Sequence, residues 1–269
     1  MAFPCRRRLL LPTLALLLAA CAPTRPLPRA ARYRAVGAPG VRQVQDSLFM
    51  DETEVANIHW LEYLYFVRRD SGEAFYRAQL PDSAAYPRLR QARPAGSAAT
   101  DTAAASYLRY PGFRYFPVVG IGYAQATRYC RWRTAKVREL RLESFRRPVR
   151  DTYYGPRRKL LRTYDVDATY RLPTPAEWEL AAQGAAPRAA IPAPAVPVAV
   201  TDGPANALGL HHLAGNVAEY TAGPATVKGG SWFRPDVPPR ADPPNPGPRP
   251  WRGCRCACEV RARPRTAAP

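Results

Sequence analysis

The cysteines near the C-terminus are the residues of this chain whose types and spacing best suit chemistry. Cys254, Cys256 and Cys258 alternate with Arg255 and Ala257. In a β-strand, this period of two places all three thiols on one face, with successive thiols about 7 Å apart. Zinc sites use Cys pairs about two to four residues apart at a turn, which lets the sulfurs converge on one ion. The spacing therefore favours disulfide bonding over a metal site, and the connectivity cannot be deduced from the sequence alone.

The remaining nucleophiles and bases do not form a catalytic arrangement. His59 falls in an expected helix, whereas His211 and His212 point to different sides of a turn or strand. We find no glycine-rich phosphate loop and no serine or cysteine hydrolase arrangement. We therefore assign no catalytic residue.

The N-terminus predicts export and lipidation. Arg6–Arg8 precede an apolar run, Leu9–Ala20, that is too short to cross a bilayer as a helix. The run leads into Leu18-Ala-Ala-Cys21, a lipobox, which implies cleavage before Cys21 and a thioether-linked lipid on it. The alternative is an ordinary secretory signal cut at about the same place. We expect a signal peptide at residues 1–20 and a lipid-anchored protein of the cell envelope.

Charge and composition narrow the choice of partners. The chain carries a formal net charge of +19. Attraction to anionic lipids or glycan phosphates is one interpretation. A GC-rich coding bias is the interpretation we favour, because the basic residues are mostly arginine and occur beside many alanines and prolines. Nucleic acid is not expected as a partner of an exported protein.

Beyond the signal peptide, the sequence predicts one domain on a tether. Residues 21–45 comprise the lipidated cysteine and a flexible stretch rich in Pro, Arg and Ala. A single domain is expected at residues 46–262, with residues 263–269 as a tail. Residues 81–106 read as an insertion. The basic stretch 131–170 predicts a solvated helix, and a partner-binding surface is the alternative.

Two helices are expected in the N-terminal half. The stretch Phe49–Asn57 predicts a strand, and Asn57 is expected to cap the helix that follows. A second helix is expected from about Tyr123. One buried face of it contains residues at spacings of three, four and seven, namely Ala126, Tyr129, Cys130 and Val137.

A third helix has the clearest local signals. In the stretch Arg171–Gly184, Thr174 is an N-cap, Pro175 occupies the first helical position and Glu177 completes a capping box. Gly184 is expected to close the helix, and Trp178 to lie in the core. Further along, Gly229-Gly230 predicts a bulge or close backbone packing.

Short motifs follow one another in the order found in one protein family. Along the chain they are Asp51-Glu-Thr-Glu-Val-Ala-Asn57, Ala126 to Trp132, Arg171 to Gly184, Leu213 to Thr221, Val227-Lys-Gly-Gly-Ser-Trp232 and Trp251 to Val260. Together they resemble the formylglycine-generating enzyme, or sulfatase-modifying factor, family. The resemblance implies an α+β domain, a variant of the C-type lectin fold, with much irregular loop.

The resemblance also bears on catalysis. Oxidase members of the family convert a sulfatase cysteine to formylglycine with a copper-binding cysteine pair. That pair would lie three and eight residues after Ser231, where this chain has Arg234 and Pro239. Neither side chain offers the soft sulfur ligand that suits reduced copper. We therefore expect a non-catalytic binding or structural domain, and the alternative is a cysteine-dependent oxidase of exported proteins that uses the C-terminal cysteines.

One disulfide bond is implied by the resemblance. In oxidase members, a cysteine matching Cys130 is bonded to the C-terminal part of the domain. Its candidate partners here are Cys254, Cys256 and Cys258. Cys256 is preferred because it matches the cysteine of the family's Gly-Phe-Arg-Cys strand.

Calcium is the one cofactor that the resemblance leaves open. The family's site corresponds to the Glu219 carboxylate, the backbone oxygens of Gly215 and Val217, and a side chain at His212. Histidine is a poor ligand for this hard cation, so the candidate is weak. The alternative is that Glu219 stabilises its loop through hydrogen bonds.

Gliding-motility and type IX secretion lipoproteins of the family are similar to this chain. The similarity lies in Asp51–Asn57, in the run Tyr129–Arg133 and in the long link at 131–170. It implies a protein or glycan partner in the envelope. Ala22, where an aspartate is lacking, favours sorting to the outer membrane.

Overall fold

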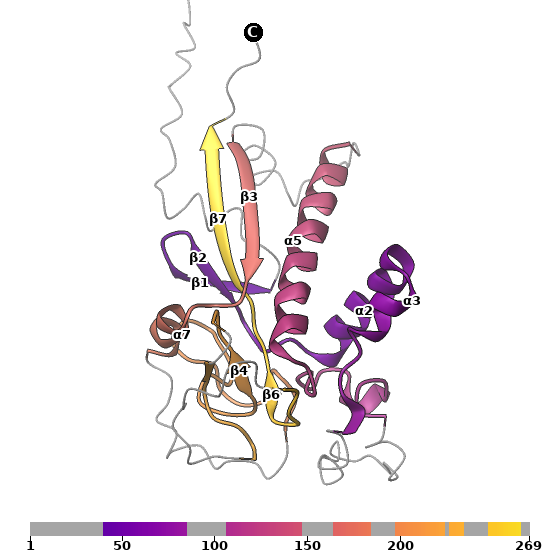
Figure 1. Ribbon diagram of the computed structural model, residues 1–269. Coiled ribbons are helices and arrows are strands. Elements are labelled where there is room, and N and C mark those ends of the chain that lie inside the picture. Colours follow the sequence, from indigo (N-terminus) through magenta and orange to yellow (C-terminus); the bar gives the residue numbers. More distant parts are fainter. Residues whose placement is uncertain are drawn as a thin grey trace, which may run out of the picture.

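The computed structural model describes residues 40–84, 106–146, 164–183, 197–223, 226–233 and 247–264. Within these ranges, helices pack beside two β-sheets (Figure 1), which confirms the expected α+β class. The helices are α2 (Asn57–Ser71), α3 (Glu73–Arg77), α5 (Tyr123–Arg146) and α7 (Pro175–Ala182), with a 3-10 turn at Pro111–Phe113. The strands are β1 (Val41–Gln45), β2 (Leu48–Asp51), β3 (Tyr164–Arg171), β4 (Ala218–Tyr220), β5 (Val227–Lys228), β6 (Arg252–Gly253) and β7 (Ala257–Pro264).

The larger sheet is antiparallel and has the order β1-β2-β7-β3. β7 lies inside it, between β2 and the full length of β3. β1 occupies residues that the sequence analysis assigned to the tether, so the first strand begins before Asp46. Val41 and Val44 pack against the apolar core. Their neighbours in the sequence, rich in Pro, Arg and Ala, obscured this strand.

α5 packs against β3 and joins it to α2. Its expected apolar face is confirmed, since Ala126, Tyr129 and Cys130 are buried. On the same side, the hydroxyl of Thr134 accepts a hydrogen bond from Tyr170 N at 2.8 Å, and it lies 3.2 Å from Tyr170 O as a donor. A helix side chain therefore satisfies the edge of the sheet. Although α5 has 24 residues, no described helix is long and apolar enough to cross a membrane.

α2 begins at Asn57, but the predicted cap is wrong. The N-cap is Ala56, and no side chain caps the helix. The Asn57 amide donates instead to the carbonyl oxygens of Phe113, at 2.9 Å, and Tyr107, at 3.4 Å. Because Asn57 is fully buried, contact with this distant segment replaces the local capping bond.

An aromatic cluster joins α2 to α5. The ring of Trp60 stacks on that of Tyr129, with centroids 5.3 Å apart. Tyr63 lies edge-on to Tyr129 at 5.6 Å and contacts Trp132 at 5.2 Å. Such pairs contribute to stability beyond their apolar burial, so they hold α2 against α5.

The smaller sheet has the order β5-β4-β6, with β4 antiparallel to β5 and parallel to β6. α7 contacts it through Trp178. The expected capping box is confirmed, because Thr174 Oγ1 accepts from Glu177 N at 3.2 Å and Glu177 accepts from Thr174 N at 2.8 Å. Close packing at Gly229 is also confirmed. Its φ is +78°, and an added Cβ would lie 3.2 Å from the Leu213 carbonyl oxygen.

Candidate functional site

The C-terminal cysteines lie where the chain passes from the smaller sheet to the larger one. The sequence predicted one strand over this stretch, but β6 and β7 belong to different sheets, and residues 254–256 connect them. The connection is bonded to the end of β2 and to the segment after it, with Asp51 N donating to Cys256 O at 2.9 Å and Val55 N to Cys254 O at 2.8 Å. The two ends of this stretch lead into different sheets, so residues 254–256 do not form a regular strand of their own.

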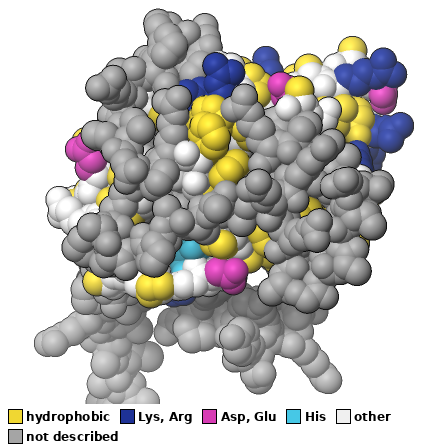
Figure 2. Space-filling view, turned by 90° about the horizontal axis from the view of Figure 1, so that it is seen from below, with side chains coloured by type: hydrophobic (Ala, Val, Ile, Leu, Met, Phe, Trp, Pro, Cys, Tyr) yellow, Lys and Arg dark blue, Asp and Glu magenta, His cyan; other side chains and the backbone are white. Residues whose placement is uncertain are grey.

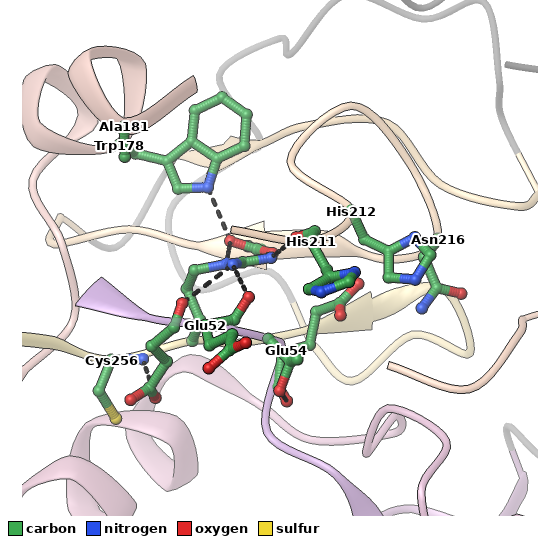
Figure 3. A network of polar contacts seen from close by, with 12 residues as sticks. Glu52, Glu54, Trp178, Ala181, His211, His212, Asn216 and Cys256 are labelled. Atoms are coloured by element: carbon green, nitrogen blue, oxygen red, sulfur yellow. Dashed lines mark hydrogen bonds and ion pairs between the residues drawn. The ribbon is translucent and has the colours of Figure 1, made fainter. Parts of the chain in front are cut away.

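Arg255 is the centre of a buried polar network. Figure 3 shows this network, with Trp178, His211 and Cys256 labelled. The Arg255 side chain is 0% exposed, and its Nη2 lies 2.7 Å from Glu219 Oε1. Nε donates to both oxygens of the same carboxylate at 2.8 Å. The other donors reach backbone oxygens, with Nη1 3.1 Å from Asp51 O and Nη2 2.6 Å from His211 O. Trp178 Nε1 donates to Glu219 Oε2 at 2.7 Å.

This network bears on the calcium candidate. Burial alone would lower the pKa of Arg255, but the attraction of Glu219 outweighs it and the pKa is raised. The guanidinium therefore stays charged and neutralises the carboxylate that the resemblance assigned to calcium. Gly215 and Val217 lie in the loop before Glu219, and calcium binding there would require this ion pair to break. The alternative function of Glu219, hydrogen bonding within the protein, matches the geometry.

The two adjacent histidines differ in surroundings. His212 adopts a φ of +57°, and its Nε2 lies 3.2 Å from Ala199 O. Burial lowers the pKa of His212 to about 4, so the ring is neutral at physiological pH. Nδ1 of His211 is buried and has no hydrogen-bond partner. Across the described residues, no three His, Cys, Asp or Glu side chains gather as a metal site would require.

Glu54 is a buried acid that the sequence analysis did not single out. It is 1% exposed, and its carboxylate lies near the side chain of Asn216 without a well-formed hydrogen bond. Burial raises the pKa of Glu54 to about 8, with Arg255 opposing the rise and Glu219 adding to it. Glu54 is therefore largely protonated at neutral pH. Its signal in the sequence is a charged residue next to the apolar pair Val55-Ala56, inside a motif that forms core.

A sulfur layer lies on the other side of the connection, against α5. The sulfurs of Cys130 and Cys256 are 2.7 Å apart, and Cys254 and Cys258 are also buried. The cysteine that the resemblance preferred is thus the one beside Cys130, and the covalent bond itself stays a prediction. Burial raises the pKa of Cys130, Cys254 and Cys256. Raised values disfavour the thiolate, which is the reactive form.

An ion pair closes this layer toward the surface. Arg133 Nη1 lies 2.6 Å and 2.7 Å from the two oxygens of Asp51. Asp51 Oδ2 also accepts from Cys256 N at 2.8 Å. Both ends of the ion pair are largely covered, at 18% and 6% side-chain exposure. Asp51 and Arg133 therefore fix the position of Cys256, and both lie in stretches that the sequence analysis singled out, Asp51–Asn57 and Tyr129–Arg133.

Several predicted positions fall outside the described residues. They are the signal peptide, Cys21, Arg234, Pro239 and Gly184. Ser231, by contrast, is described and is 3% exposed. It is followed by the buried Trp232, whose Nε1 donates to Pro250 O at 3.3 Å. His59 lies on α2, as expected.

Solved structures similar to this chain share little sequence with it. Treponema denticola variable protein 1 is 16% identical, with 83% of this chain and 92% of that chain covered at a TM-score of 0.46. PvdO from Pseudomonas aeruginosa is 17% identical, with 79% of this chain and 80% of that chain covered at a TM-score of 0.44. CarF is 15% identical, with 86% of this chain and 95% of that chain covered at a TM-score of 0.44. No curated protein matches the sequence significantly.

A family assignment comes from the sequence match. The model of the "Sulfatase-modifying factor enzyme 1-like domain" family matches residues 28–193. This match spans more than half of the 269-residue chain. It includes the first three motifs of the sequence analysis, the third of which contains the capping box. The chain therefore belongs to the sulfatase-modifying factor enzyme 1-like domain family.

Proposed function

We propose that this protein is a lipoprotein of the cell envelope whose domain binds or supports other envelope components and does not catalyse cysteine oxidation. The observation that carries the proposal is the pair Arg234 and Pro239, at the positions where the resemblance places the copper-binding cysteines. Without those thiols the family's oxidase has no ligand pair for reduced copper. A protein or glycan partner at the outer membrane, as in the gliding and type IX secretion lipoproteins, is the function we infer.

The remaining cysteines support a structural role. A cysteine-dependent oxidase needs an accessible thiolate. Cys254 and Cys256 are 0% exposed, and burial raises the pKa of both. Arg255, between them, is fully engaged by Glu219 and by backbone oxygens. This stretch is built to hold two sheets together.

An oxidase assay tests the non-catalytic part of the proposal. The mature protein is incubated with copper, a reductant, oxygen and a sulfatase-type cysteine peptide, and the peptide mass is followed. We expect no conversion to formylglycine, while an oxidase member of the family converts the peptide in parallel. Copper-dependent turnover that is lost in Cys254→Ser or Cys256→Ser would establish the oxidase alternative and overturn the proposal.

A fractionation experiment tests the lipoprotein part. Cys21→Ser should leave the protein unlipidated and shift it out of the membrane fraction. Cys5→Ser is the matched control, because Cys5 lies within the predicted signal peptide and its loss should change nothing. Mass spectrometry of the mature N-terminus is the direct readout. An unmodified Cys21 in the wild-type protein would disprove the anchor.

A further inference from the structure

The outer surface of α2 and α3 contains an open hollow of about 400 Å³. Its apolar lining includes Leu61, Tyr65 and Tyr76, and its basic lining is Arg68, Arg69 and Arg109. Figure 2 shows Lys and Arg side chains among hydrophobic ones along the upper right edge, on the side where α2 and α3 lie in Figure 1. We call the hollow and its rim the α2–α3 face.

The arginines of this face can exchange their present partners. Arg68 Nε lies 3.4 Å from Glu73, with the side chains 66% and 48% exposed. Arg69 Nε lies 2.5 Å from Asp70, and these side chains are 53% and 41% exposed. Ion pairs this exposed contribute little to stability. Arg109 donates to the Tyr76 hydroxyl at 3.1 Å and forms no ion pair with any residue that the structure describes.

The rim of the face is aromatic as well as basic. Tyr65 is 65% exposed and Phe75 is 39% exposed. Arg128 lies over the Phe75 ring at 5.8 Å and Arg69 over the Phe66 ring at 4.8 Å. A guanidinium matches the geometry of a phosphate, and tyrosine rings prefer the boundary between lipid head groups and acyl chains. Arginine beside exposed tyrosine therefore fits the surface of a bilayer.

We propose that the α2–α3 face binds the phosphate head group of an anionic lipid and lays the domain on the membrane that anchors it. The anchor is part of the proposed function. The apolar lining beside the arginines favours a lipid over a free phosphate ester. A chain of the length from Cys21 to Gly40 can span at most about 60 Å, so the face can meet the bilayer. Attraction of basic surfaces to anionic lipids supplies the affinity.

A vesicle flotation experiment tests the face separately from the anchor. The mature chain carrying Cys21→Ser is mixed with vesicles of phosphatidylglycerol and phosphatidylethanolamine or of phosphatidylcholine alone. We expect flotation only with the anionic vesicles, and at least a tenfold loss of binding in Arg68→Gln/Arg109→Gln. The charge-matched control is Arg138→Gln/Arg261→Gln, at two other exposed arginines, and it should keep binding within about twofold.

A matched pair of tyrosine variants tests the aromatic rim. Tyr65→Ser should weaken binding several-fold, whereas Tyr115→Ser, at a tyrosine that is 58% exposed, should not. Equal losses in the face and control variants would show a general charge effect and overturn the proposal. Competition by soluble glycerol phosphate at the affinity of the vesicles would overturn the lipid as the source of the phosphate. Failure of lipidation in cells would disprove the anchor and leave these vesicle results unchanged.

Discussion

Arginine–carboxylate pairs occur in two contrasting regions of this molecule. At the junction of the two sheets, Arg255 and Glu219 are 0% and 1% exposed, and their polar atoms are bonded to one another, to Trp178 or to the backbone. On the α2–α3 face, Arg69 and Asp70 form a shorter contact but are about half exposed. The same chemistry fixes a structure in one place and offers a replaceable bond in the other.

The difference lies in solvation rather than in distance. Water stabilises each exposed charge when its partner leaves, so an exposed pair contributes little. A buried charge has no such replacement, and removing its partner is strongly destabilising. We therefore expect Arg255 to contribute to stability, whereas the exposed arginines are available for the binding that we propose.

The largest expected effect comes from Arg255→Met. The change leaves the Glu219 carboxylate buried without a countercharge, which should lower the free energy of unfolding by about 3–5 kcal/mol. Urea denaturation followed by circular dichroism measures it. Arg68→Met is the control, with an expected change of about 0–1 kcal/mol. Similar losses in both variants would contradict the contrast between the two regions.

The sulfur layer provides the second test. If the contact between Cys130 and Cys256 is a disulfide in the oxidised protein, reductant should lower the free energy of unfolding by about 2–4 kcal/mol. The Cys130→Ser variant should be less stable than the oxidised wild type and insensitive to reductant. Mass spectrometry of a non-reduced digest identifies the bonded pair. A wild-type protein whose melting temperature ignores reductant would refute the bond.

Glu54 gives an effect that is smaller per pH unit but accumulates as the pH changes. Its pKa is raised from 4.5 to about 8 in the folded protein, so the folded state holds a proton that the unfolded chain releases. Stability should fall as the pH rises from about 4.5 to 8, by up to about 1.4 kcal/mol per pH unit. Glu54→Gln should flatten this slope and stabilise the protein near pH 8. Glu52→Gln, at a partly exposed neighbour, should leave the slope unchanged.

The smallest effect is expected at the ion pair of Arg171 and Glu177. Their side chains are 36% and 23% exposed, which is between the exposures of the buried and the surface pairs. The hydrogen bond from Arg171 is the main reason that the pKa of Glu177 is lowered. Its stabilisation is present above about pH 4.5 and is lost as the pH falls. Arg171→Gln should lower the free energy of unfolding by about 0.5–1 kcal/mol at pH 7. The difference between variant and wild type should shrink on acidification, and a difference that persists at low pH would exclude this cause.

Local signals predicted part of this fold well. The capping box of α7 uses residues three positions apart, and the face of α5 follows helical spacing, so both can be recognised within a short window. Asn57 shows the limit of that approach. Its side chain suits an N-cap, yet it bonds to carbonyl oxygens about fifty residues away.

The candidate site could be located from the sequence but not understood from it. The motifs pointed to Glu219 and to the cysteines, and the resemblance favoured Cys256. Nothing local shows that Arg255, between two cysteines, faces away from them toward Glu219. That placement arises because the residues before and after this stretch belong to two different sheets. Side-chain directions of this kind follow from tertiary contacts alone.

The position of β7 also sets the order in which the protein can be completed. This strand lies inside the larger sheet, between β2 and β3, yet it comes last in the chain among the described strands. A ribosome delivers it after every other described strand. Until then β2 and β3 have no strand to join them, and Glu219 has no Arg255. Closure of the larger sheet therefore waits for the last of the described strands, and the chain made before it stays open for the export that we propose.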